Sequence, residues 1–148
     1  MKLSTKGRYG LRAILDLAVH ASGGHVPINL IAERQDISVS YLEHLFSLLR
    51  KAGLVRSVKG AQGGYMLGYP ADRMRVGDVL RALEGELSLV EDHLESAPEM
   101  DTLSRCIRKM VWEPVDLSIN RLVDRITLDE LVEEDRALNG LVEPMYHI

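Results

Sequence analysis

Cysteine is nearly absent from this chain of 148 residues, which contains only Cys106. One thiol cannot close a disulfide within the chain, and this predicts a reducing compartment. Long apolar runs are also missing, because no stretch approaches the roughly 20 apolar residues that a membrane-spanning helix needs. The first residues, Met1 to Lys6, are charged and lack the apolar core of a secretion signal. We therefore expect a cytoplasmic protein with no membrane partner.

The residue patterns of an enzyme are missing as well. The five histidines are scattered along the chain, and no arrangement of a nucleophile, a base and an acid is suggested. The glycine-rich stretch at 60–64 lacks the Lys-Ser pair of a phosphate-binding loop. Hydrophobic residues make up 46% and charged residues 27% of the sequence, which is typical of a globular protein. We expect no catalytic residues and no enzymatic activity.

The chain has fewer basic than acidic residues and a net charge of −4, but the basic residues are unevenly distributed. Residues 1–60 hold nine lysines and arginines against four acidic residues, a net charge of +5. Residues 61–148 hold nine basic and 18 acidic residues, a net charge of −9. A basic front favours a surface for a polyanion such as DNA, although uneven surface charge alone gives the same pattern.

Hydrophobic spacing predicts three helices and a hairpin in the first 70 residues. The helices are expected over about 5–21, from Pro27 onward and over 39–52, and the strands over 54–58 and 65–67. This order is typical of a winged helix-turn-helix. A linker at 70–75 and a short helix at 76–83 follow. We predict a mostly α-helical fold with a small β-hairpin wing, in which residues 1–83 form the DNA-binding domain.

The second half is expected to begin with an exposed acidic loop at 84–101 and to continue as a long helix over 102–125. Pro114 should kink that helix. A short acidic helix at 127–138 follows, so that 102–138 holds the dimerisation helix and a short C-terminal helix. Asn139-Gly140 is expected to break the last helix and to begin a tail at 139–148.

The long helix carries an apolar stripe that has no obvious partner helix in its own subunit. Its residues step by four or three: Leu103, Ile107, Val111, Val115, Ile119, Leu122 and Ile126. A two-fold copy of the same helix is the simplest partner. The sequence therefore predicts a homodimer.

The helix over 39–52 has two faces of different character. Leu42, Leu45, Phe46 and Leu49 share one face and predict a core contact, while Ser40, Glu43, His44, Ser47 and Lys51 share the other. Short polar groups near the start and cations near the end suit a recognition helix, although an ordinary solvated face looks similar. Lys59 and Gln62 at the tip of the wing are placed to enter a minor groove. Ser38 and Ser40 both remain candidates for the N-cap.

Three segments resemble the Rrf2 family of repressors: Met1 to Gly10, Ile37 to Phe46, and Gly53-Leu54-Val55 through Gly64-Tyr65-Met66-Leu67. The match spans nearly all of residues 1–83 and continues weakly through Val111-Trp112-Glu113 and 126–131. The resemblance implies a dimeric repressor that binds double-stranded DNA. The candidate DNA-binding residues are Lys2, Ser4, Thr5, Lys6, Arg8, Tyr9, Ser38, Ser40, Tyr41, Glu43, His44, Ser47, Arg50, Lys51, Lys59 and Gln62.

Two positions depart from the family's iron–sulfur cluster regulator. His44 stands where that branch has glutamine, and Lys59 stands where it has arginine. Lysine lacks the planar fork of arginine and is more strongly hydrated, which weakens insertion into a minor groove. The base preference of the family is therefore not expected to transfer unchanged.

The family also contains members that bind a [2Fe–2S] cluster through three cysteines before the long helix. Cys106 stands at the last of these positions, but the histidine expected three residues later is Lys109, and the loop offers only His93 and carboxylates. Such a cluster usually needs four ligands, mostly thiolates. We expect no cofactor and no metal. Cys106 is then a remnant or packing residue, and the alternatives are a redox-sensing thiol or a cluster ligand.

The chain ends at Tyr146-His147-Ile148, with a terminal carboxylate beside an apolar side chain. This pattern suits a pocket of backbone N–H donors beside an apolar slot. The cysteine-metabolism branch of the family ends similarly, and in that branch cysteine synthase acts as co-repressor. The resemblance therefore suggests that Tyr146 and Ile148 dock in cysteine synthase, with a regulator of cysteine metabolism as the main interpretation. A regulator of iron–sulfur assembly that senses a cluster or thiol oxidation is the alternative.

Overall fold

The computed structural model describes residues 2–21, 24–61, 63–90 and 101–146, with the backbone alone for 142–146. Three helices come first, and two antiparallel strands follow them. These elements are α1 (Thr5–His20), α2 (Ile28–Gln35), α3 (Val39–Lys51), β1 (Val55–Val58) and β2 (Gly64–Leu67). A 3-10 turn, η2 (Ala71–Arg73), leads into α4 (Val76–Glu84). The predicted winged helix-turn-helix is confirmed.

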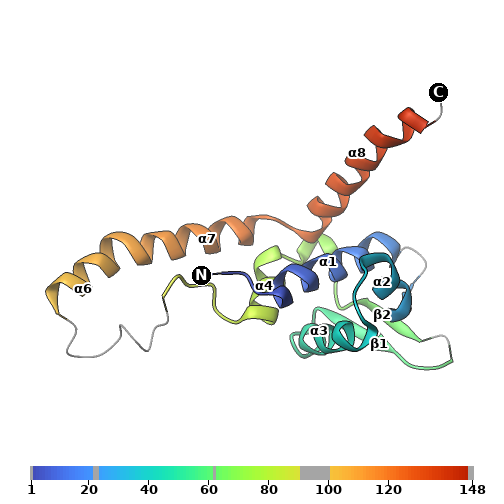
Figure 1. The fold of residues 1–148 in the computed structure, drawn as a ribbon, viewed down its shortest axis with the longest axis horizontal. Coiled ribbons are helices and arrows are strands. Elements are labelled where there is room, and N and C mark those ends of the chain that lie inside the picture. Colours follow the sequence, from blue (N-terminus) through green and yellow to red (C-terminus); the bar gives the residue numbers. More distant parts are fainter. Residues whose placement is uncertain (1, 22–23, 62, 91–100, 147–148) are drawn as a thin grey trace.

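The second half forms a long rod and a final helix. The rod consists of α6 (Thr102–Ile107), the π-helical turn η3 (Arg108–Trp112) and α7 (Glu113–Arg125), and α8 (Leu128–Tyr146) follows it. In Figure 1 the rod extends to one side of the winged domain, and α8 projects away from both. Among the described residues no helix combines the length and the apolar composition needed to cross a bilayer.

One hydrophobic core holds the first domain together, and α3 passes through it. Leu42, Leu45, Phe46 and Leu49 of α3 are all fully buried, as their spacing predicts. The Ser38 hydroxyl accepts a hydrogen bond from the Tyr41 backbone N–H at 3.1 Å, which makes Ser38 the N-cap of α3.

The helical rod continues past Pro114, and its hydrogen-bond pattern changes from α-helical to π-helical just before the proline. Proline has no N–H to donate, and its ring crowds the carbonyl four residues earlier. The backbone N–H of Glu113 donates to the carbonyl of Arg108, five residues back, so the wider π-helical turn lies immediately before the proline. The rod therefore stays continuous where a kink was expected.

Two further expectations for the second half were wrong. Leu87, in the segment expected to be an exposed loop, is buried with Val76 and Leu80, because an apolar slot between α4 and α7 accepts it. The last helix does not stop at Asn139-Gly140 but runs to Tyr146. A glycine inside a helix costs only about 1 kcal/mol relative to alanine, which is too little to end a helix already anchored in the core at Leu128.

Candidate nucleic-acid interface

The exposed face of α3 presents the polar side chains that the sequence singles out. Ser40, Glu43 and His44 are exposed, Ser47 is half-buried, and Arg50 and Lys51 are exposed at the end of the helix. Short acceptors and donors thus lie near the start of the helix, and two cations lie at its end. This is the arrangement that base-edge contacts flanked by phosphate contacts require.

The start of α1 lies beside the start of α3. The Tyr41 hydroxyl donates a hydrogen bond to Thr5 Oγ1 at 3.1 Å, and the rings of Tyr9 and Tyr41 meet edge to face at 6.4 Å. The structure therefore brings the predicted N-terminal contacts next to the recognition helix. Tyr41 itself is half-buried, and its hydroxyl already has a partner.

Arg12 belongs to the same surface, and sequence reasoning missed it. Its guanidinium lies 5.8 Å from the centre of the Tyr9 ring, within the range of a cation–π contact. The three-residue spacing between Tyr9 and Arg12 on a helix was the available signal.

Tyr65 of β2 helps to fix the wing to the domain. Val26 pairs with Tyr65 through backbone hydrogen bonds of 2.8 and 2.9 Å, which adds a third short chain to the hairpin. The Tyr65 ring stacks on Phe46 of α3 with centroids 4.6 Å apart. Lys59 is exposed immediately after β1. Gln62, the other predicted wing contact, lies outside the described residues.

A buried carboxylate joins α1 to α2. Asp16 is 5% exposed and accepts hydrogen bonds from Arg34 Nη2 at 2.7 Å, Arg34 Nε at 3.0 Å and Gln35 Nε2 at 2.7 Å. Burial by itself would raise the pKa of Asp16, but the hydrogen bonds from Arg34 and Gln35 outweigh burial and lower that pKa. This network sets the position of α2, the helix before the recognition helix.

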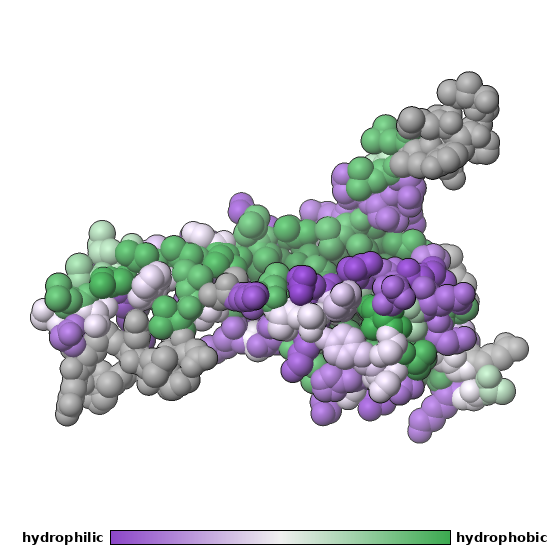
Figure 2. All heavy atoms as spheres, viewed as in Figure 1, coloured by the Kyte–Doolittle hydropathy of each residue, from purple (hydrophilic) through white to green (hydrophobic). Residues whose placement is uncertain are grey.

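The rod exposes the predicted apolar stripe over most of its length. The exposed members are Leu103, Ile107, Val111, Val115 and Leu122, of which Leu103 is 75% and Leu122 52% exposed. Met110 and Leu117, which the four-and-three spacing did not include, are also exposed. Figure 2 shows hydrophobic residues running along α6 and α7 to the base of α8. Such a continuous apolar face is typical of a protein interface.

The C-terminal end of the apolar stripe packs against the winged domain of its own subunit. Ile119 is half-buried, and Ile126 packs with Val123 against the small cluster of Val76, Leu80 and Leu87. Ile126 is therefore part of the contact between α7 and the winged domain rather than of the free apolar face.

A polar contact attaches the rod to the winged domain. Arg81 of α4 donates to Asp124 at 2.9 and 2.8 Å and to Asn120 Oδ1 at 2.8 Å, both on α7. The hydrogen bond from Arg81 holds the pKa of Asp124 below its ordinary value. Sequence reasoning missed this pair, because its members are 43 residues apart. α4 thus contacts both α7 of the rod and the predicted recognition helix α3.

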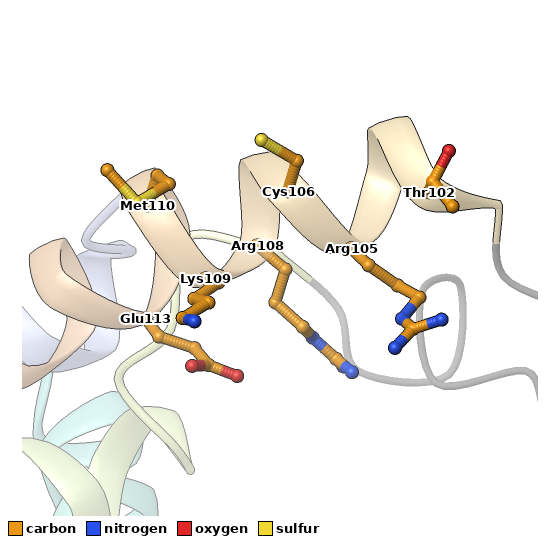
Figure 3. A pocket seen from close by; sticks show the side chains of 7 residues that line it. All are labelled: Thr102, Arg105, Cys106, Arg108, Lys109, Met110 and Glu113. Atoms are coloured by element: carbon orange, nitrogen blue, oxygen red, sulfur yellow. The ribbon is translucent and has the colours of Figure 1, made fainter.

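The donor set around Cys106 does not fit an iron–sulfur cluster. Cys106 is exposed and is the chain's one cysteine, and Lys109 occupies the next helical turn. Among the residues that the structure describes, no three His, Cys, Asp or Glu side chains gather as metal ligands, and His93 lies outside them. Figure 3 shows the Cys106 thiol pointing away from the side to which Arg105 and Arg108 point, so these cations do not surround the thiol.

The predicted partner-docking tail lies almost wholly outside the described side chains. Tyr146 is the last residue of α8, and Ile148 is not among the described residues. The helix continues through Asn139 and Gly140, where the sequence predicted the start of a tail.

The sequence is similar to regulators of transcription. A family model described as "Rrf2: Iron-dependent Transcriptional regulator" matches residues 3–134. The HTH-type transcriptional regulator IscR of Aliivibrio salmonicida is 44% identical over 135 residues, which cover 91% of this chain and 79% of the relative. The IscR of Pectobacterium atrosepticum is 44% identical over 140 residues, which cover 94% of this chain and 84% of the relative.

The fold is similar to solved structures of the same kind. CymR, the global cysteine regulator of B. subtilis, matches with a TM-score of 0.76 and 37% identity, covering 90% of this chain and 98% of that one. T. potens IscR matches with a TM-score of 0.73 and 43% identity, covering 91% and 88%. With a recognition helix, a wing and these relatives, the chain belongs to the Rrf2 family of DNA-binding transcriptional regulators.

Proposed function

We propose that this protein is a homodimeric, sequence-specific repressor that reads a two-fold operator. In this proposal α3 enters the major groove with Ser40, Glu43 and His44, and Lys59 on the wing approaches the minor groove. The observation that carries the proposal is the exposed polar face of α3, flanked by exposed cations on α1, α3 and the wing. The net charge of +5 over residues 1–60 supports it.

In the proposed dimer the two halves of the chain have different roles. Residues 1–83 read DNA, and the exposed apolar face of α6 and α7 pairs with the same face of a second copy. The rod spans 24 residues, about 36 Å at 1.5 Å per residue, which is long enough to set the spacing of two recognition helices. Selection of bound sequences from a random DNA pool tests the proposal. A palindromic consensus supports it, and recovery of unrelated sequences overturns it.

The comparisons favour an IscR-like role over a regulator of cysteine metabolism. The relatives at 44% identity are named IscR, and the cysteine function belongs to the B. subtilis protein by its own description. We therefore propose operators of the IscR kind and, from the family resemblance, genes of iron–sulfur assembly as targets. Docking to cysteine synthase draws no support from these relatives, and we do not retain it.

Replacing Glu43 with alanine should change which operator sequence is preferred, because this exposed carboxylate lies on the face that meets base edges. Replacing Lys6 with alanine should weaken binding to all sequences about equally and reduce the slope of log affinity against log salt by about 0.9 for each phosphate that is no longer neutralised. Fluorescence anisotropy with the selected operator and with single-base variants measures both effects. If both substitutions weaken binding uniformly, α3 is not the reading helix.

The purified protein should be colourless and should bind its operator without a metal. The reason is the donor set, because Cys106 is the one cysteine of the chain and a [2Fe–2S] cluster usually needs four ligands, mostly thiolates. Anaerobic reconstitution with iron and sulfide, followed by absorption spectroscopy and iron analysis, measures this. A stable chromophore with stoichiometric iron would contradict the prediction, and its loss in Cys106→Ser would identify the thiol as a ligand.

A further inference from the structure

Glu84, the last residue of α4, reaches across to the first turn of α1. Its Oε1 atom accepts hydrogen bonds from the Ser4 backbone N–H at 3.0 Å, from the Gly7 backbone N–H at 2.8 Å and from the Ser4 hydroxyl. The first N–H groups of a helix have no partner within the helix, and they carry partial positive charge. A carboxylate from a residue 80 positions away thus satisfies the start of α1.

The two helices approach so closely because α1 has glycines on the side that faces α4. A Cβ atom at Gly7 would lie 2.6 Å from Glu84 Oε1, and a Cβ atom at Gly10 would overlap the side chain of Leu83. Both glycines are buried, although glycine lowers helix propensity. The two glycines lower the helix propensity of α1, and they allow this close contact with α4.

The residues held by Glu84 lie within the proposed phosphate-binding segment. Lys2, Lys6 and Arg8 are exposed on either side of Ser4 and Gly7. Residues 2–4 precede the helix, so hydrogen bonds at Ser4 fix where the chain enters it. On the other side, Thr5 contacts Tyr41 of the recognition helix. Glu84 and Tyr41 together hold the first turn of α1 between α4 and α3.

We propose that Glu84 is a positioning residue for DNA binding, which fixes the first turn of α1 so that Lys2 and Lys6 meet phosphates. This inference rests on the proposed function. It predicts that removing the Glu84 carboxylate changes DNA affinity in the direction opposite to that expected from charge alone. Removing a carboxylate near a phosphate-binding surface should strengthen DNA binding through charge alone, whereas removing a positioning residue weakens it.

The test compares three variants by anisotropy titrations with the selected operator over a range of salt concentrations. Glu84→Ala should bind about tenfold more weakly at moderate salt and with a salt slope that is shallower by about 0.9 for each phosphate left without its cation. Glu86→Ala is the matched control, because it removes the same charge from an exposed neighbour that makes no hydrogen bond to α1. Glu84→Gln should restore most of the affinity, because an amide oxygen still accepts from Ser4 and Gly7.

Gly7→Ala gives a second route that does not depend on the stability of Glu84→Ala. Alanine favours the helix, but its Cβ displaces the carboxylate, so DNA binding should weaken while the folded helix is retained. In the Glu84→Ala background the same change should have no further effect. Circular dichroism and sedimentation check that each variant is folded and in the same oligomeric state as the wild type.

A double-mutant cycle with Lys6→Ala separates the positioning role of Glu84 from the phosphate contact of Lys6. If Glu84 acts by holding the segment, Lys6→Ala should weaken binding in the wild type and have little further effect beside Glu84→Ala. Equal affinities and salt slopes for Glu84→Ala and Glu86→Ala would overturn the role of Glu84 while leaving the DNA-binding proposal in place. No effect of Lys6→Ala in the wild type would overturn the proposed phosphate contact itself.

Discussion

Replacing Ile119 and Leu122 together with aspartate should convert the protein to monomers and abolish operator binding. Leu122 is 52% exposed and Ile119 half-buried on α7, in line with the exposed apolar residues of the rod. Two carboxylates per subunit would have to be buried without partners if the faces still paired. A monomer reaches only one half-site at a time, so affinity should fall by about a hundredfold or more.

Sedimentation at micromolar concentration and anisotropy with the operator measure these two effects. Arg121→Asp is the control, because it places the same side chain on an exposed position of α7 outside the apolar stripe. This control should remain dimeric. A wild-type protein that sediments as a monomer at micromolar concentration would rule out the dimer.

Replacing Asp16 with asparagine should lower the free energy of unfolding by about 2 kcal/mol at neutral pH. The asparagine amide presents a donor where the carboxylate accepts from Arg34 and Gln35. The substitution therefore removes the negative charge and one acceptor from a buried hydrogen-bond network. The effect is smaller than for a fully buried pair, because the Arg34 side chain is 33% exposed and turns to water. Urea unfolding followed by circular dichroism, at one fixed protein concentration, measures it.

The pH dependence of that difference identifies its cause. The folded pKa of Asp16 lies below its ordinary value, so its stabilising effect is present above the unfolded pKa of about 3.9 and is lost as pH falls through the folded pKa. The gap between wild type and Asp16→Asn should therefore be present above about pH 5 and narrow below about pH 4. Asp72→Asn, at an exposed position, should show no such gap. A gap that is independent of pH down to about pH 2 would contradict the role of the ionised carboxylate.

Much of the fold could be predicted because its signals are local in the sequence. The spacing of Leu42, Leu45, Phe46 and Leu49 predicts a helix with one buried side, and all four are buried. Glycines between two short β-branched and aromatic runs predict the hairpin, and a long apolar stripe predicts the exposed rod. Each of these patterns depends on the periodicity of one element, which a sequence shows directly.

The positions of these elements relative to one another depend on pairs that no periodicity reveals. Glu84 meets Ser4 across 80 residues, Arg81 meets Asp124 across 43, and Asp16 meets Arg34 across 18. In the sequence Glu84, Arg81 and Asp16 are each one charge among many, and only packing selects their partners. The same holds for Ile126, which belongs to the apolar stripe by spacing but to its own subunit by contact.

The sequence by itself thus determined the winged helix-turn-helix, the polar face of α3 and the apolar face of the rod, because side-chain periodicity fixes which face of an element is buried. Only the tertiary structure decided where the first turn of α1 is held and how the rod joins α4. These features depend on contacts between distant residues, and such contacts form only when whole helices pack.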